Sequence, residues 1–336
     1  MEPVDLRYCP RGVRIRGMGY YVPERVVDNH ELARRVDTSD EWIKGKIGIS
    51  ERRICTPDQT PVDIGLKAAK RALVDADLDA EEIDLLVMTT MQPDHLDPMP
   101  STELAHRLGA NRAAAFNMAV GGCPDSVFSL VTAVQYLLTG GCRRVLLVNA
   151  EVTSRLIDPL DRTTCVFFGD GACCWVLEAS QANTGLLGYV LGTDGSGFGA
   201  AHIPACGSRL PFEPGMDERL RYLFMDGRAI MDFATRVFPS SVRVLLEHLG
   251  LDLDDISMFF AHQANWHIIN RSLAHLGVGM DRTHTNIHKY GNTSSASLGI
   301  AIHEARELGK LNAGDLITMS SFGAGLAWGS VVWRWG

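Results

Sequence analysis

The feature that most constrains the fold of this chain is a pattern that occurs twice. Residues 77–88 and 250–261 each place a leucine and several acidic residues before an apolar run, and each follows an amphipathic helical pattern. The two segments lie roughly 170 positions apart, whereas the repeats of solenoid proteins span about 20–50 residues. The period therefore predicts two similar halves, which we place at residues 1–180 and 181–336.

Helical patterns alternate with short apolar runs along both halves. We expect a helix at residues 61–74 and strands at residues 13–18, 83–88, 144–148 and 173–177. This alternation is typical of an α/β protein whose parallel sheets are covered on both faces. In a duplicated α/β unit, functional groups are expected where the equivalent strand-to-helix turns of the two halves meet.

A cysteine lies in one of these turns. Cys123 follows Gly121-Gly122 and precedes Pro124-Asp125, which suit the first turn of the helical pattern that ends near Gly140. A helix N-terminus favours a thiolate and supplies N–H donors to an oxyanion beside it. Position alone also fits a buried, inert cysteine, so partner residues elsewhere in the chain must decide between the two readings.

Composition excludes several classes of function. The net charge of -8 argues against a nucleic-acid-binding surface, and no apolar run is long enough to span a membrane. The N-terminal segment lacks the continuous apolar core of a signal peptide, so we expect a cytoplasmic protein. The eight cysteines form no C-x-x-C pair, and His284 and His288 have no further ligand cluster nearby in the sequence. We therefore expect reduced thiols and no metal site.

Five motifs in order give the chain a family resemblance. They are residues 37–43 (DTSDEWI), 161–172 (with DR and FGDGA), 259–265 (FFAHQAN), 289–297 (KYGNTSSAS) and 322–329 (FGAGLAWG). With Cys123, they resemble β-ketoacyl-ACP synthase III of the thiolase superfamily over nearly the whole chain. The resemblance implies a thiolase-like duplicated five-layered αβαβα fold, a homodimer, and a Cys-His-Asn site reached by a pantetheine tunnel. It implies no resident cofactor, because the CoA thioester is a substrate.

The resemblance also assigns chemical roles. Cys123 is the nucleophile that takes an acyl group from a thioester. His262, with a neutral Nε2–H, and Asn292, with its NH2 group, hold the enolate formed when a malonyl thioester loses carbon dioxide. The backbone N–H groups of Cys123 and Ala324 form the oxyanion hole for the acyl carbonyl. His262 alone would suit a satisfied histidine at a strand end, and its partners favour the catalytic reading.

Substrate contacts follow from the same resemblance. They are assigned to Trp42, Lys46, Arg162, Asn265, Met99 and Phe322. Trp42 and Arg162 match positions that embrace the CoA adenine, but Lys46 stands where an arginine is usual, which predicts weaker CoA binding. Met99 matches a residue that the dimer partner contributes to the acyl pocket, and a flexible methionine there would admit a longer acyl chain.

Two further departures lie at the cysteine. Pro124-Asp125 replace small residues, and Gly121-Gly122 include one residue more than usual before Cys123. A carboxylate at position 125 would raise the pKa of the thiol. Together with Met99, these departures predict a specialised paralogue, with secondary metabolism as a candidate setting.

The predicted function is acyl transfer to Cys123 followed by decarboxylative Claisen condensation, as in a 3-oxoacyl-ACP synthase III. An acyltransferase of the same fold that passes the acyl group to a hydroxyl, amine or thiol stays open, although Asn292 disfavours it. A thiolase would need a second catalytic cysteine, and none follows Cys206. A non-catalytic subunit would have lost Cys123 or His262, and a papain-like protease would carry a different cysteine signature. The acyl donor, the extender and the pathway stay open.

An acyl carrier protein is a further candidate partner. In the family it docks on a basic helix after the His-Gln-Ala-Asn motif, here residues 265–276, where only Arg271 is permanently charged. Electrostatic attraction should then be weak, which favours CoA-borne substrates or an apolar contact through Trp266. Arg221, Arg236 and Arg243 are alternative sources of positive charge.

Overall fold

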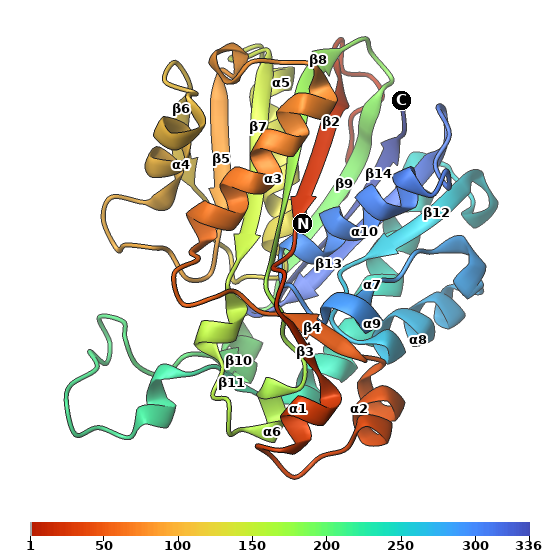
Figure 1. Cartoon of the computed structure of the whole chain (residues 1–336). Helices are drawn as coiled ribbons and strands as arrows, with labels where there is room; N and C mark the ends of the chain where they lie inside the picture. Colours follow the sequence, from red (N-terminus) through yellow and green to blue (C-terminus); the bar gives the residue numbers. More distant parts are fainter. Residues whose placement is uncertain (1) are drawn as a thin grey trace.

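The computed structural model describes residues 2–336, which form two five-stranded sheets (Figure 1). The first sheet has the order β2 (Gly12–Tyr21), β8 (Gly171–Ser180), β7 (Arg144–Glu151), β5 (Leu85–Thr89) and β6 (Ala114–Asn117). The second sheet has the order β1 (Val4–Asp5), β9 (Gly185–Thr193), β14 (Ala327–Arg334), β13 (Leu316–Gly323) and β12 (Ile256–Ala261).

Both sheets are mixed, so the expectation of purely parallel sheets was wrong. β5 is parallel to β6 and β7, and β12 is parallel to β13, but β8, β2, β14, β9 and β1 continue the sheets in antiparallel pairing. The link between β13 and β14 shows the physical reason. Only residues 324–326 separate these strands, and a connection this short can join antiparallel strands but cannot cross back to a parallel one.

Helices cover and separate the sheets in five layers, as expected from the sequence. α3 (Pro61–Ala76) and α4 (Pro100–Leu108) pack on the outer face of the first sheet. α5 (Asp125–Leu138) and α10 (Ala296–Glu307) lie between the sheets and contact strands of both. α7 (Gly227–Leu249) packs on β14, β13 and β9, with α8 (Trp266–Leu276) beside it. Figure 1 shows this αβαβα arrangement.

The duplicated sequence pattern corresponds to duplicated local structure. α3 and α7 both end at a residue with left-handed backbone, Asp77 (φ 51°) and Gly250 (φ 60°). A 3₁₀ turn follows in each half, at Ala80–Glu82 and Leu253–Asp255, and then a buried strand, β5 or β12. The turns that precede the two central helices, α5 and α10, hold Cys123 and Asn292.

Several short elements gather at one end of the two sheets (Figure 1). They are β3 (Val26–Asp28), α1 (Asn29–Ala33), α2 (Asp40–Ile47), β4 (Glu51–Arg53), α6 (Arg162–Cys165), β10 (Ala201–His202), β11 (Phe224–Met225) and α9 (Ile287–Tyr290). Ser39 caps α2, because its Oγ accepts a hydrogen bond from Trp42 N at 3.1 Å. In residues 2–336, no helix combines the length and apolar character that a bilayer crossing requires.

Candidate active site

Cys123 lies in the tight turn that leads into α5. Gly122 adopts a positive φ of 84°, and a Cβ at this position would lie 2.3 Å from Met91 Sδ, so the turn requires glycine. α5 begins at Asp125, and Pro124 already accepts hydrogen bonds from the first turn of the helix. The cysteine therefore lies at the start of the helix, as the sequence predicted.

Asp125 organises the turn that precedes Cys123. Its buried carboxylate accepts hydrogen bonds from the backbone nitrogens of Val120 at 2.6 Å, Gly121 at 3.2 Å and Gly122 at 3.3 Å. Burial raises the pKa of Asp125 to about 6, against the lowering effect of these three bonds. The carboxylate binds the loop before Cys123, a role that its position in the sequence did not reveal.

The thiol of Cys123 is protonated in the resting site. Burial raises its pKa to about 12, a hydrogen bond from Ser294 lowers the pKa, and the charges of Glu151 and Asp125 raise it. The effect of Asp125 has the direction expected from the sequence. The helix N-terminus favours a thiolate, as the sequence analysis noted, but desolvation outweighs this effect on the pKa of Cys123.

His262 extends from the end of β12 into the same space. Its Nδ1 lies 2.6 Å from Ser297 Oγ, which also accepts a hydrogen bond from Gln263 N at 3.1 Å. The hydroxyl proton of Ser297 is satisfied by donating to Nδ1, and this assignment places the imidazole proton on Nε2. Burial lowers the pKa of His262 to about 3, so the ring is neutral at physiological pH.

Asn292 is held by both its backbone and its side chain. Asn292 N donates to Phe167 O at 2.8 Å, and Gly169 N donates to Asn292 O at 3.0 Å, so the residue is fixed against the segment before β8. Its Oδ1 accepts a hydrogen bond from Ser294 N at 2.8 Å. The NH2 group is consequently the part of the amide that remains for a ligand.

The turn after β13 lies directly against Cys123. A Cβ on Gly323 would lie 3.0 Å from Cys123 Cβ, and a Cβ on Gly121 would lie 2.8 Å from Ala324 O. Within residues 2–336, the backbone N–H groups of Cys123 and Ala324 donate to no protein acceptor. Cys123 and Ala324 also line the same pocket, so these two N–H groups are available to an oxyanion bound there.

Cys123, His262 and Asn292 line one pocket of about 950 Å³, a volume that includes its open mouth. The other walls are mainly apolar. They include Met91, Phe167, Phe168, Leu223, Met225, Ile230, Met231, Ile268 and Phe322. Six of the wall residues lie between positions 201 and 231, a segment in which the sequence showed no motif.

The predicted substrate residues are only partly brought together. Asn265 and Phe322 line the pocket, and the Phe322 ring meets His262 edge-on with ring centroids 5.7 Å apart. Trp42 and Arg162 form a separate pair at the surface, with Arg162 Cζ 5.2 Å from the indole ring. Lys46 is exposed, and its carbonyl oxygen lies 3.5 Å from Asn265 Nδ2.

Met99 does not line the pocket of its own chain. It is 45% exposed at the start of α4, whereas Met91, which the sequence analysis did not single out, contacts the pocket. Sequence reasoning also missed the roles of Ser297 and Glu151. Ser297 could have been found as the last position of the NTSSAS motif, which is the second residue of α10.

The histidine pair at positions 284 and 288 has a structural environment. His284 Nε2 lies 3.1 Å from Glu304 Oε2, and Asn286 and Tyr290 donate to the same carboxylate. This carboxylate satisfies three polar groups around α9. Among the residues that the structure describes, no group of three or more His, Cys, Asp or Glu side chains could hold a metal ion.

Comparison with known proteins supports one family. Residues 117–195 match the profile of 3-oxoacyl-[acyl-carrier-protein (ACP)] synthase III, and residues 246–335 match the profile of its C-terminal region. The chain is similar to the β-ketoacyl-[acyl-carrier-protein] synthase III of Caldanaerobacter subterraneus subsp. tengcongensis, with 42% identity over 96% of this chain and 97% of the relative.

Two solved structures resemble the chain over nearly its full length. The 3-oxoacyl-[acyl-carrier-protein] synthase III of Aquifex aeolicus VF5 has a TM-score of 0.90 and 36% identity, covering 96% of this chain and 100% of that one. The priming β-ketosynthase from the R1128 polyketide biosynthetic pathway has a TM-score of 0.90 and 34% identity, covering 97% of each chain. The chain therefore belongs to the β-ketoacyl-ACP synthase III family of thiolase-like, acyl-transferring condensing enzymes.

Proposed function

We propose that the protein condenses an acyl group, held on Cys123, with the carbon nucleophile released from a malonyl thioester. The observation that carries this proposal is the convergence of Cys123, His262 and Asn292 on one apolar pocket beside the unpaired N–H groups of residues 123 and 324. An acyl-CoA is the proposed donor, and malonyl-ACP or malonyl-CoA is the proposed extender. Family membership supports both substrate classes.

The first half-reaction is a thioester exchange. The sulfur of Cys123 attacks the acyl carbonyl, the bond from that carbon to the CoA sulfur breaks, and CoA leaves as a thiol with the proton of Cys123. The developing oxyanion accepts hydrogen bonds from Cys123 N and Ala324 N. The exchange has little driving force of its own, because one thioester replaces another, so acylation is readily reversible.

The second half-reaction forms the carbon–carbon bond. The malonyl group loses carbon dioxide, and the electrons of the broken bond give an enolate whose oxygen is held by His262 Nε2–H and the NH2 group of Asn292. The enolate carbon attacks the acyl-cysteine carbonyl, the bond from that carbon to the sulfur of Cys123 breaks, and the thiolate takes up one proton from solvent. A neutral His262 suits this role, because it donates a hydrogen bond without having to lose a charge.

The alternative is acyl transfer to a hydroxyl, amine or thiol without bond formation between carbons. Such a reaction generates no enolate. The NH2 group of Asn292 would then have no enolate oxygen to bind. Incubation with acyl-CoAs of different length and malonyl-CoA, followed by mass spectrometry of protein and products, separates the two reactions. Condensation predicts release of carbon dioxide and a 3-oxoacyl product; acyl-enzyme without either result would favour the alternative.

The proposal also includes a homodimer, in which each chain consists of two similar halves. The exposed position of Met99, outside the pocket of its own chain, supports a partner subunit that receives this side chain. The division into residues 1–180 and 181–336 stays a prediction, supported by the crossing from β8 to β9 at residues 181–184. Cytoplasmic location and a role in secondary metabolism also stay predictions.

A further inference from the structure

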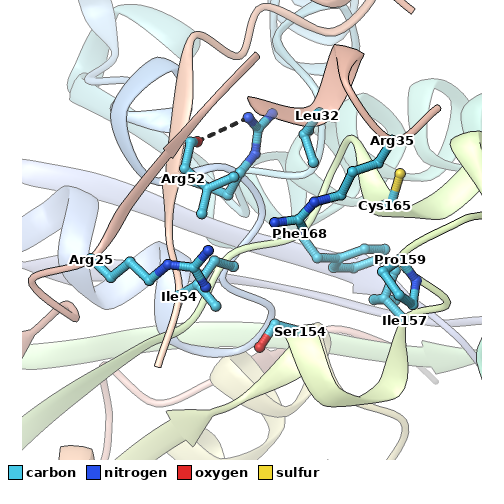
Figure 2. Close-up of a pocket in the computed structure, with 11 residues that line it drawn as sticks. Arg25, Leu32, Arg35, Arg52, Ile54, Ser154, Ile157, Pro159, Cys165 and Phe168 are labelled. Carbon is cyan, nitrogen blue, oxygen red and sulfur yellow. Dashed lines mark hydrogen bonds between the residues drawn. The ribbon is translucent and has the colours of Figure 1, made fainter. Parts of the chain in front are cut away.

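A second pocket, here named the arginine pocket, shares the Phe168 side chain with the candidate active site (Figure 2). It lies among β3, α1, β4 and α6 and encloses about 600 Å³, including its opening. Its apolar wall includes Leu32, Ile54, Ile157 and Pro159. Figure 2 shows Arg25 and Arg35 approaching this wall from opposite sides, with Arg52 above Arg25 in this view.

The two outer arginines share a single carboxylate. Arg25 Nη2 and Arg35 Nη2 both bond to Glu31 Oε1, at 2.9 Å and 2.5 Å. One negative charge therefore serves two guanidinium groups, and their side chains remain 47% and 43% exposed. The two outer guanidinium groups therefore outnumber the one carboxylate that pairs with them, and their unused N–H groups are accessible to a ligand.

The third arginine is buried without an ion pair. Arg52 is only 1% exposed, and it donates to Val27 O at 3.1 Å, Asn29 Oδ1 at 2.9 Å and Val166 O at 3.0 Å. Figure 2 marks the bond to Val27 with a dashed line. In the described part of the chain, Arg52 Nε has no hydrogen-bond partner. An uncompensated buried cation with an unused donor is costly unless an anion approaches it.

Three acidic residues lie close enough for their charge to act on Arg52: Asp28, Glu51 and Glu31, whose carboxylate the two outer arginines share. Asp28 accepts a hydrogen bond from Glu31 N at the start of α1, and Glu51 pairs with Arg53. The charges of both carboxylates raise the pKa of Arg52, but neither carboxylate accepts a hydrogen bond from it. Burial lowers the pKa of Arg52 to about 10, so the guanidinium is still charged at neutral pH.

We propose that the arginine pocket binds a small organic oxyanion, a carboxylate or phosphate monoester on a short apolar chain. The guanidinium groups of Arg25 and Arg35 bind the oxyanion, and the charge of Arg52 adds to the attraction from behind. The short chain lies on the apolar wall, where it removes hydrocarbon from water. This binding site is additional to the acyl and thioester sites of the proposed reaction.

The site is adjacent to the residues that hold Asn292. Arg52 Nη2 donates to Val166 O, and the next residue, Phe167, accepts from Asn292 N. The same short segment therefore touches both pockets. Because Phe168 is the one lining residue that the two pockets share, the arginine pocket should still bind its ligand when Cys123 carries an acyl group.

The test is calorimetric titration of the purified full chain, with Cys123 acylated and free, at low ionic strength. The probes are hexanoate, hexyl phosphate and hexanol. We expect one equivalent of at least one anion to bind, with hexanol at least about tenfold weaker. Tighter binding of hexyl phosphate identifies a phosphate monoester as the ligand class, and tighter binding of hexanoate identifies a carboxylate.

Three variants assign the binding to this pocket. The double variant Arg25→Ser/Arg35→Ser should weaken binding at least about tenfold, whereas Glu31→Gln should strengthen it, because a competing carboxylate is removed. Arg34→Ser is the matched control, since Arg34 is exposed beside Arg35 but does not line the pocket. Absence of anion binding, equal binding of hexanol, or unchanged binding in the double variant would overturn the proposal. Since the readout is binding, none of these results bears on the condensation activity.

Discussion

The hydroxyl of Ser297 lies 2.6 Å from Nδ1 of His262, and donation of the hydroxyl proton to Nδ1 leaves the imidazole proton on Nε2. Ser297→Ala removes the donor to Nδ1 and allows the proton to move away from Nε2. We expect decarboxylation of the malonyl substrate to fall by about tenfold or more, with acylation of Cys123 nearly unchanged. Separate measurement of the two half-reactions checks this result, and Ser297→Thr, which keeps a hydroxyl, should restore part of the lost rate.

Cys123→Ala should abolish the acyl-enzyme. No other described cysteine combines the start of a long helix with a histidine and an asparagine in one pocket. Intact-protein mass spectrometry after incubation with acyl-CoA measures the adduct. Cys206→Ala is the matched control, because Cys206 is exposed and would account for non-specific acylation. An adduct that survives in Cys123→Ala would refute the assignment of the nucleophile.

Removal of either enolate donor should separate the two half-reactions. In His262→Ala and Asn292→Ala, we expect acylation to remain measurable while malonyl decarboxylation falls on the order of a hundredfold or more. In the proposed mechanism, these side chains donate to the enolate, whereas backbone N–H groups donate to the acyl oxyanion. Equal losses in both steps would show instead that the substitutions disturb the whole pocket.

Glu151 should make folding stability depend on pH. Its carboxylate is buried and accepts hydrogen bonds from Met91 N at 2.9 Å and Ser295 Oγ at 2.5 Å, and burial raises its pKa to about 7. The folded state then binds a proton more tightly than the unfolded state, so the free energy of unfolding falls as pH rises from about 4.5 to 7. The loss across this range is on the order of 3 kcal/mol.

Glu151→Gln removes this titration. The amide oxygen can accept from Met91 N, and its NH2 group can donate to Ser295 Oγ, whose proton can turn to Thr89 Oγ1 at 3.2 Å. Urea unfolding at pH 5 and pH 8 should therefore show a smaller difference in the variant than in the natural protein. Glu24→Gln, at an exposed position, is the control. If the free energies of unfolding at pH 5 and pH 8 differed by the same amount in Glu151→Gln as in the natural protein, Glu151 would not be the source of the pH dependence.

Much of the fold and site followed from local patterns. The repeat at 77–88 and 250–261 predicted the two matching helix–strand units, and the motifs around Cys123, His262 and Asn292 predicted a common site. Strand direction at β8 and β14 could not be predicted, because it depends on which strands pair across long stretches of sequence. The protonation state of the Cys123 thiol could not be predicted from the sequence either, because its burial depends on every element around the pocket.

Asp125 shows the same limit at a single residue. The sequence indicated a carboxylate close to Cys123 and the direction of its effect on the pKa of the thiol. It did not indicate that this carboxylate would accept hydrogen bonds from three successive backbone nitrogens. That contact depends on the backbone conformation of the turn before Cys123. Departures from a family motif thus locate a change more readily than they explain it.

The last prediction concerns a carrier protein. From the sequence, α8 offered only Arg271 as a permanent positive charge, and Trp266 was the candidate apolar anchor. The structure alters both points. Arg236 and Arg243 of α7 share a groove with His275 of α8, where Arg243 Nη2 donates to His275 O at 2.7 Å. Trp266 is partly buried against the apolar cluster of α2, so its indole ring is less available as an anchor.

We therefore expect an acidic carrier to be attracted by the arginines of α7 and α8 together. Arg236→Ser/Arg243→Ser should lower kcat/KM for a malonyl group on an acyl carrier protein about fivefold at low salt and less at moderate salt, because salt screens surface charges. The kcat/KM for malonyl-CoA should change little. Arg34→Ser is the control, because Arg34 is exposed and does not belong to α7 or α8. Equal loss with malonyl-CoA would indicate structural damage, and a carrier reaction indifferent to both salt and the double variant would show that docking is not electrostatic.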